Sequence, residues 1–279
     1  MLPITRKRLM ANALLFGIMA TSPGLSFADE DTGTDASTEN SYGIETGYTH
    51  ESGKYGTRQE TRSATVPLTA YYDTEHYGIE AMLPYMSITG PAGGIAGRVR
   101  HLISQPRPIV TAQGIADSTV SVTRDLLNSE SAGLDWDLGT TIKFATGDVH
   151  RGLGTGANDY ALFTDVSEMI SQLTLTGTAG YTWYGSKGLV MVNGYMENLQ
   201  FKDAAFGQLD GAVKLHEHTK IGLTCYAQQP TEGKIPEEES TAYLTIGLGN
   251  HVDLKLYALK GFTKASPNQG YGATMRADF

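Results

Sequence analysis

Hydrophobic and polar residues alternate with a period of two over most of the chain after residue 40, and almost no stretch has the 3.6-residue period of an amphipathic helix. Such alternation is typical of β-strands with one apolar and one polar face. It predicts about twelve strands, at residues 41–51, 59–72, 76–89, 114–126, 134–146, 158–168, 172–184, 203–216, 219–229, 239–249, 251–262 and 270–279. The chain is therefore expected to be all-β.

The connections between these strands alternate in length. Short ones, at 73–75, 127–133, 169–171, 217–218 and 250, alternate with long ones rich in Gly and Pro, at 52–58, 90–113, 147–157, 185–202, 230–238 and 263–269. Outer-membrane barrels have short turns on one rim and long loops on the other, whereas a soluble sandwich has no reason to keep that order. We expect a transmembrane antiparallel up-and-down β-barrel over residues 41–279. A thirteenth strand at 189–200 would make the count odd, so this segment is assigned to an outer loop.

The last ten residues (GYGATMRADF) form the clearest strand and end on an aromatic residue. Tyr271 and Phe279 lie on its apolar face, about 20 Å apart along the membrane normal once strand rise and tilt are considered. This spacing suits two aromatic girdles with an apolar band between them. A strand ending in Phe resembles the closing strand of bacterial outer-membrane barrels, whose assembly machinery recognises that end. Phe279 is therefore expected to contact the barrel-assembly machinery.

The N-terminal residues have the features of a signal peptide. Arg6, Lys7 and Arg8 precede an apolar stretch at 9–20, and Ser26-Phe27-Ala28 offers a cleavage site. We expect residues 1–28 to be removed on export; the alternative is a membrane anchor. Residues 29–40 are acidic and lack large apolar side chains, which predicts a disordered lead-in.

Charge and cysteine content narrow the classes further. The chain has 21 Lys and Arg against 30 Asp and Glu, a net charge of −9 that becomes −12 without the signal peptide. Nucleic-acid binding needs basic patches, so we expect no nucleic-acid partner. Cys225 is the only cysteine and excludes an intrachain disulfide.

If the apolar faces contact lipid, the polar faces line the interior, because Arg or Lys facing lipid at the bilayer midplane costs about 2–4 kcal/mol. The acidic residues assigned inward are Glu45, Glu80, Asp117, Asp125, Asp135, Asp137, Asp159, Asp165, Asp210, Asp253 and Asp278, and the basic ones are Lys143, Lys214, Lys220, Lys255 and Arg276. An acidic excess disfavours anions in a wet lumen. In the alternative interpretation, these charges pair and fill a narrow interior. The residues predicted to line a pore are Asp117, Asp135, Asp137, Lys143, Asp210, Lys214, Asp253, Lys255 and Arg276.

The connection at 90–113 is basic within an acidic protein. It carries Arg98, Arg100, His101 and Arg107 and no Asp or Glu. This outer-loop basic patch is interpreted as a constriction at the mouth, as a clamp for lipopolysaccharide phosphates, or as a solvated loop without a specific role.

Three motifs that suggest other chemistry are rejected. Gly152, Gly154 and Gly156 lack the following helix that a dinucleotide fingerprint requires. The His216-Glu217-His218 sequence has no evident third metal ligand. Ser52 lies near His50, but in an expected outer loop without an orienting acid, and no nucleophile motif of an acyl hydrolase is present. No catalytic residue, metal site or cofactor is therefore predicted.

Three runs carry a resemblance to a known family. Residues 143–162 (KFATGDVHRGLGTGANDYAL), 114–127 (GIADSTVSVTRDLL) and 179–186 (AGYTWYGS) resemble segments of bacterial outer-membrane "transporter" proteins associated with the meta-pathway of phenol degradation. The resemblance implies an outer-membrane barrel and, from the gene context of the family, uptake of aromatic or other small hydrophobic compounds.

These observations favour a passive outer-membrane channel for small organic solutes, exported to a Gram-negative outer membrane and in contact with its lipids and lipopolysaccharide. The alternative is a structural or lipopolysaccharide-contacting barrel with a plugged lumen, and a third is an outer-membrane enzyme.

Overall fold

The computed structural model describes residues 40–95, 106–129 and 133–279. The predicted signal peptide and nearly all of the predicted lead-in fall outside these residues and remain predictions. Within the described part of the chain, no helix is long and apolar enough to cross a membrane.

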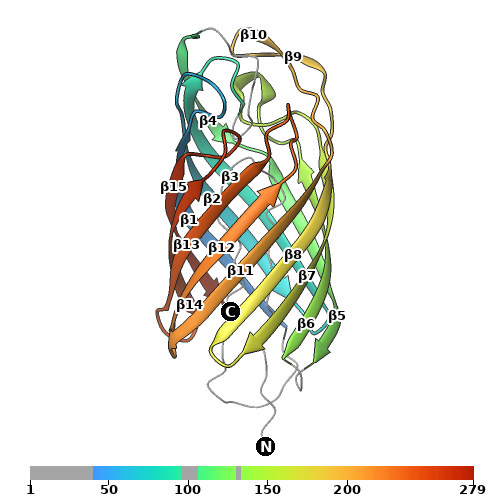
Figure 1. Cartoon of the computed structure of the whole chain (residues 1–279), viewed down its shortest axis with the longest axis vertical. Helices are drawn as coiled ribbons and strands as arrows, with labels where there is room; N and C mark the ends of the chain where they lie inside the picture. Colours follow the sequence, from blue (N-terminus) through green and yellow to red (C-terminus); the bar gives the residue numbers. More distant parts are fainter. Residues whose placement is uncertain (1–39, 96–105, 130–132) are drawn as a thin grey trace, which may run out of the picture.

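The described residues form a single upright barrel (Figure 1). Its strands are β1 (Ser41–Gly53), β2 (Thr61–Asp73), β3 (Tyr77–Pro91), β4 (Ile109–Ile115), β5 (Ser118–Ser129), β6 (Leu134–Phe144), β7 (Asp159–Ile170), β8 (Leu173–Trp183), β11 (Ala204–His216), β12 (Thr219–Gln228), β13 (Glu237–Gly247), β14 (Val252–Gly261) and β15 (Gln269–Asp278). All neighbours pair antiparallel, and β1 closes the barrel by pairing with both β2 and β15. The predicted all-β antiparallel barrel is confirmed.

Strands β4 and β5 share one position in the wall, which makes the barrel twelve-stranded as predicted. Both pair with β3, and the ladder is interrupted between them at residues 116–117. Pro84 of β3 lies at the interruption and has no N–H for the ladder, while its carbonyl oxygen accepts a hydrogen bond from the Ala116 N–H at 2.9 Å. The strand expected at 114–126 therefore begins earlier, at Ile109, and consists of two parts.

The segment at 189–200 lies outside the wall, as predicted. It forms a separate hairpin of β9 (Leu189–Val192) and β10 (Tyr195–Asn198), at the end of the barrel opposite the C-terminus (Figure 1). We call the end that carries this hairpin the outer end and the other the inner end. The loops between β6 and β7, which contain the short 3₁₀ turn η1 (Val149–Arg151), and between β8 and β11 both lie at the outer end.

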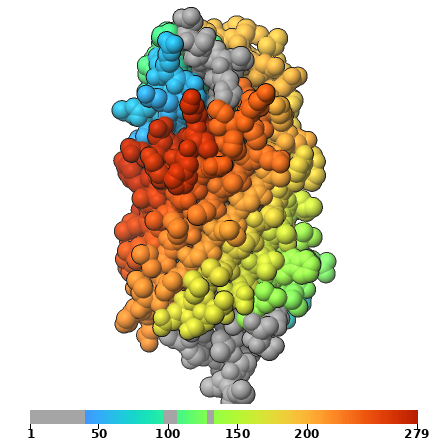
Figure 2. Space-filling view, viewed as in Figure 1, coloured from blue at the N-terminus to red at the C-terminus, as the bar shows by residue number. Residues whose placement is uncertain are grey.

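The outward faces of the strands form an apolar belt, and the space-filling view shows the wall closed by side chains over one face (Figure 2). Exposed aromatic residues lie toward both ends of this belt: Tyr42, Tyr72, Tyr77, Trp136 and Phe279 at the inner end, and Tyr85, Phe144, Tyr160, Trp183, Phe262 and Tyr271 at the outer end. Tyr42 and Phe279 stack with ring centroids 6.0 Å apart where the first and last strands meet. The belt and its aromatic ends match the outer surface of a lipid-embedded barrel.

Candidate functional site

The inner half of the barrel interior is lined by charged and hydroxyl side chains of the wall. Lys255 is almost fully buried, with its Nζ 4.8 Å from the ring centroid of Tyr243 and 6.0 Å from that of Tyr257. Asp210 accepts hydrogen bonds from Thr224 Oγ1 at 2.6 Å and from Tyr243 Oη at 3.0 Å. Inward charges here are held by neighbouring aromatic and hydroxyl groups.

Three basic side chains of this half, Lys214, Lys220 and Lys255, lie on one row of register partners across β11 to β14. The strand register aligns Lys255 with Thr245, Thr245 with Lys220, and Lys220 with Lys214. Arg276 lies closer to the inner end, where its guanidinium is 3.8 Å from the ring centroid of Tyr71 and its Nε donates to Asp278 Oδ1 at 3.0 Å.

The other predicted pore-lining acids lie on the same inward faces. Asp253 is opposite Arg276 in the β14–β15 register, and Asp137 is opposite Asp165 in the β6–β7 register. Asp135 and Asp253 are only partly buried. These placements agree with strand parity, and their role in solute passage remains a proposal.

Inward aromatic rings lie flat against the wall. In five cases the ring is directly opposite a glycine of the adjacent strand, and a Cβ at that glycine would overlap the ring: Phe163 with Gly139, Phe206 with Gly180, Tyr243 with Gly222, Tyr257 with Gly272 and Tyr71 with Gly43. The glycine gives each ring room against the backbone, as in aromatic rescue of strand glycines.

The outer half of the interior contains an apolar cluster. Wall residues of β7, β11 and β12 cluster there with residues of the loops, in a set comprising Ile95, Ala161, Phe163, Tyr184, Val190, Val192, Leu199, Phe201, Ala204, Phe206 and Tyr226. Val192 and Leu199 are completely shielded from water. The β9–β10 hairpin lies at the outer rim (Figure 1), and its Val190 and Val192, with Leu199 and Phe201 after it, share one apolar cluster with the wall residues.

A few polar contacts fasten this hairpin. Arg107 forms an ion pair with Glu197 of β10, and its guanidinium lies 4.2 Å from the ring centroid of Tyr195. His150 of η1 contacts the Met191 carbonyl through Nδ1 at 3.0 Å. Arg107 thus contacts the hairpin, while Arg98 and Arg100 of the predicted basic patch lie outside the described residues.

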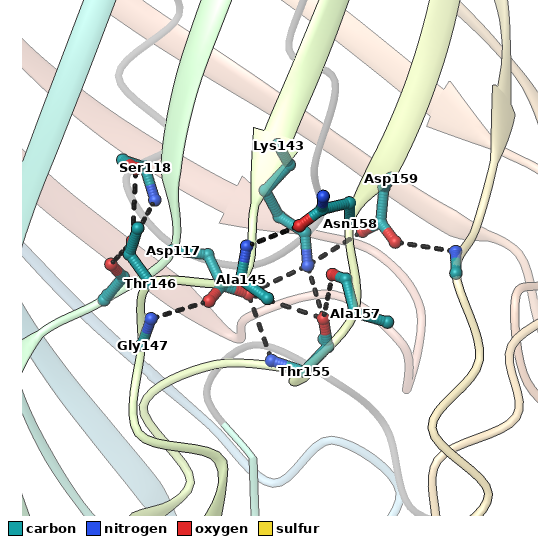
Figure 3. A network of polar contacts seen from close by, with 12 residues as sticks. Asp117, Ser118, Lys143, Ala145, Thr146, Gly147, Thr155, Ala157, Asn158 and Asp159 are labelled. Carbon is teal, nitrogen blue, oxygen red and sulfur yellow. Dashed lines mark hydrogen bonds and ion pairs between the residues drawn. The ribbon is translucent and has the colours of Figure 1, made fainter.

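A buried ion-pair network lies at the base of the loop between β6 and β7 (Figure 3). Lys143 Nζ is 2.8 Å from Asp117 Oδ2 and 2.9 Å from Asp159 Oδ2, and it also donates to Thr155. Asp159 Oδ1 accepts from the Gly185 N–H at 2.9 Å. One lysine thereby connects the β4–β5 interruption, the β6–β7 loop and the end of β8.

The glycines of the rejected nucleotide motif serve this network. Asp117 accepts hydrogen bonds from the N–H groups of Gly147 and Thr155, both at 3.0 Å. A Cβ at Gly154 would overlap the Asp117 carboxylate, and Gly152 ends η1 in the left-handed conformation with φ 77°. The backbone of the motif therefore lies against the carboxylate of Asp117 and binds no nucleotide phosphate in this arrangement.

Carboxylates also gather at the outer mouth, around Tyr55 in the loop after β1. Burial raises the pKa of the Tyr55 hydroxyl well above its ordinary value, and the nearby Glu51, Glu237 and Glu239 raise this pKa further. Glu51 and Glu239 are buried on the inward faces of β1 and β13. Within the described ranges, no group of three His, Cys, Asp or Glu is arranged to hold a metal ion.

Sequence reasoning missed the inward aromatic residues and the apolar outer half. Strand parity was the available signal: Phe163 shares parity with Asp165, and Phe206 shares parity with Asp210. Ser52 belongs to the end of β1 instead of the outer loop expected for it.

A closed barrel of twelve antiparallel strands with this apolar belt is an integral protein of the Gram-negative outer membrane. Residues 59–279 match the family described as "Putative MetA-pathway of phenol degradation", and the chain belongs to this family. The resemblance carried by residues 114–127, 143–162 and 179–186 is thereby confirmed.

Solved structures share the fold. An outer membrane channel from Pseudomonas putida F1 has a TM-score of 0.70 at 11% identity, over 91% of this chain and 100% of that chain. The NanC porin has a TM-score of 0.53 at 9% identity, over 84% of this chain and 98% of that chain. The β domain of the Bordetella autotransporter BrkA has a TM-score of 0.52 at 10% identity, over 86% and 100%. No curated protein matches the chain.

Proposed function

We propose that the protein is a channel through which small organic solutes cross the outer membrane by passive diffusion. The observation that carries this proposal is the position of the inward aromatic rings. Each of the five lies against a glycine of the adjacent strand, and three of them, Tyr71, Tyr243 and Tyr257, belong to none of the apolar clusters of the described residues. A barrel filled only for stability has no such requirement, because its rings gain most by interdigitating across the interior.

The two halves of the interior suit different parts of the passage. An apolar solute gains free energy in the outer half, where Phe163, Phe206 and Tyr226 line the wall. The β9–β10 hairpin lies at the outer rim beside this cluster, and in this proposal it moves to let a solute pass. In the inner half, carboxylates outnumber basic groups among the predicted lining residues, which disfavours anions. Membership in a family named for phenol degradation supports organic solutes.

A plugged structural barrel is the second candidate. The near-complete burial of Val192, Leu199 and Lys255 favours it, because side chains that line an open aqueous pore contact water. In that case the hairpin is a permanent part of the core.

Recordings from purified mature protein in planar lipid bilayers separate the two. The channel is expected to give discrete conductance steps and, in a salt gradient, a reversal potential shifted toward that of the cation. Silence from protein whose folding is verified by heat-dependent gel mobility would favour the plugged barrel. Steps with anion preference would retain the channel and contradict the acidic lumen.

A further inference from the structure

Among the buried side-chain atoms that have no hydrogen-bond partner within the described part of the chain, three acceptors lie close together on the lumen side of the wall. They are Asp165 Oδ2 on β7, Gln208 Oε1 on β11 and Glu239 Oε2 on β13. The exposed fractions of these residues are 2%, 7% and 3%. Buried polar atoms in folded proteins are almost always paired, with protein groups or with water, so acceptors left open in this way indicate a place for a donor.

The three acceptors lie on one row of the wall. In the strand register Asp165 is opposite Thr178, which is opposite Gln208. Gln208 is opposite Tyr226, which is opposite Glu239. With strands about 4.8 Å apart and tilted by about 40°, this acceptor row rises roughly 12 Å along the barrel axis, toward the outer end.

The open groups of the acceptor row have a single chemical character. All three are acceptors, and two of them are carboxylate oxygens. The basic row with Lys214, Lys220 and Lys255 lies elsewhere on the wall, because on β13 two inward residues, Tyr243 and Thr241, separate Thr245 of the basic row from Glu239.

Apolar surface adjoins the row. Tyr226 belongs to it, and Phe206 lies two residues from Gln208 on β11, with its ring centroid 6.4 Å from that of Tyr226. A solute whose polar group reaches Gln208 or Glu239 therefore places its apolar part against these two rings.

We propose that the acceptor row is a binding site for solutes that carry a hydrogen-bond donor, a hydroxyl or ammonium group, on an apolar body. This inference rests on the proposed channel function and names the class of solute. A donor-bearing solute satisfies the open acceptors, whereas an analogue with acceptors alone leaves them unpaired, and sites of this kind discriminate strongly against such analogues. An anionic solute is expected to bind weakly, because the carboxylates of Asp165 and Glu239 repel it.

The test compares four probes that share one ring: benzylamine, benzyl alcohol, anisole and benzoate. Equilibrium dialysis measures their binding to the mature protein in lipid nanodiscs, with empty nanodiscs subtracted. Benzylamine and benzyl alcohol are expected to bind about tenfold more tightly than anisole, the ratio that one hydrogen bond to a charged group provides, and benzoate is expected to bind most weakly.

The variant that combines Asp165→Leu, Gln208→Met and Glu239→Met removes each open acceptor and is expected to bring the ratio of donor probes to anisole close to one. If the triple variant does not fold, each single substitution is expected to lower the ratio in part. Glu80→Met is the matched control, because it removes an inward carboxylate on β3 that lies outside the row. The ratio is expected to survive this substitution.

An unchanged ratio in the row variants overturns the inference. A preference for benzylamine also overturns it if benzyl alcohol binds no better than anisole, because the charge of the probe, and not its hydrogen-bond donor, would then determine affinity. Conductance steps without a donor preference overturn the inference and leave the channel in place. No conductance together with no binding of any probe overturns both.

Discussion

The two halves of the barrel interior are filled in different ways. In the inner half, side chains of the wall pair with one another, as Asp210 does with Thr224 and Tyr243. In the outer half, apolar wall residues such as Phe206 pack against residues of the loops, among them Val192 and Leu199. The difference teaches that the inner lining is inseparable from the barrel, whereas the outer filling comes from a segment that the barrel does not need for closure.

The β9–β10 hairpin and the β6–β7 loop also differ in the polar contacts that hold them. The β9–β10 hairpin pairs with no wall strand, and the Arg107–Glu197 ion pair is among the few polar contacts that hold it. The loop between β6 and β7 is instead fixed from inside by Lys143 and its two carboxylates. The following experiments test whether the outer filling can be separated from the wall.

Removal of the hairpin has the largest expected effect. Replacing residues 189–198 by a short Gly-Ser linker takes Val190 and Val192 out of the apolar cluster at the outer end and is expected to raise single-channel conductance several-fold. The control exchanges residues 231–234 of another outer loop for the same linker and is expected to leave conductance near the native value. Equal conductance of all three proteins would show that the hairpin is not the barrier.

Lys143→Met tests the fixed loop. It leaves the carboxylates of Asp117 and Asp159 buried without their cation, which is expected to lower the free energy of unfolding by about 3–5 kcal/mol. Urea unfolding in lipid vesicles, followed by tryptophan fluorescence, measures the loss. Lys187→Met, at an exposed position of the next outer loop, is expected to be nearly neutral. Equal losses for both would mean that the network does not stabilise the fold.

Gly139→Ala tests the rings on the wall. The new Cβ overlaps the Phe163 ring, so the ring has to turn toward the axis, at a cost of about 1–3 kcal/mol. Combining Gly139→Ala with Phe163→Ala removes the overlap, so the two effects are expected to be non-additive in unfolding free energy. Gly177→Ala is the control, since a Cβ there would make only an ordinary contact with Leu209 at 3.7 Å. Additive effects would contradict the flat packing.

Tyr243→Phe has the smallest expected effect. It keeps the ring over Gly222 and removes the hydroxyl that donates to Asp210, which is expected to cost about 1 kcal/mol in the same unfolding assay. Tyr48→Phe, on the lipid-exposed face, provides the reference for loss of a hydroxyl alone. A loss no larger than this reference would show that the Asp210 contact contributes little to the inner half.

Alternation along the chain, together with the alternating short and long connections, was sufficient to predict the barrel. It placed twelve strands, assigned the apolar faces outward, and kept the hairpin at 189–198 out of the wall. Parity in the same pattern also implies that Phe163 and Phe206 point inward, because they share their faces with Asp165 and Asp210. These features are local, because the direction of a strand side chain depends only on its position along the strand.

The partners across the interior were decided by the tertiary structure alone. Lys143 meets Asp117 and Asp159, and each inward ring meets its glycine, because strand register brings residues from separate strands to the same level of the wall. The acceptor row of Asp165, Gln208 and Glu239 arises in the same way, from the stagger of five tilted strands. Register depends on closure of the whole barrel, a long-range condition that no single strand carries in its own residues.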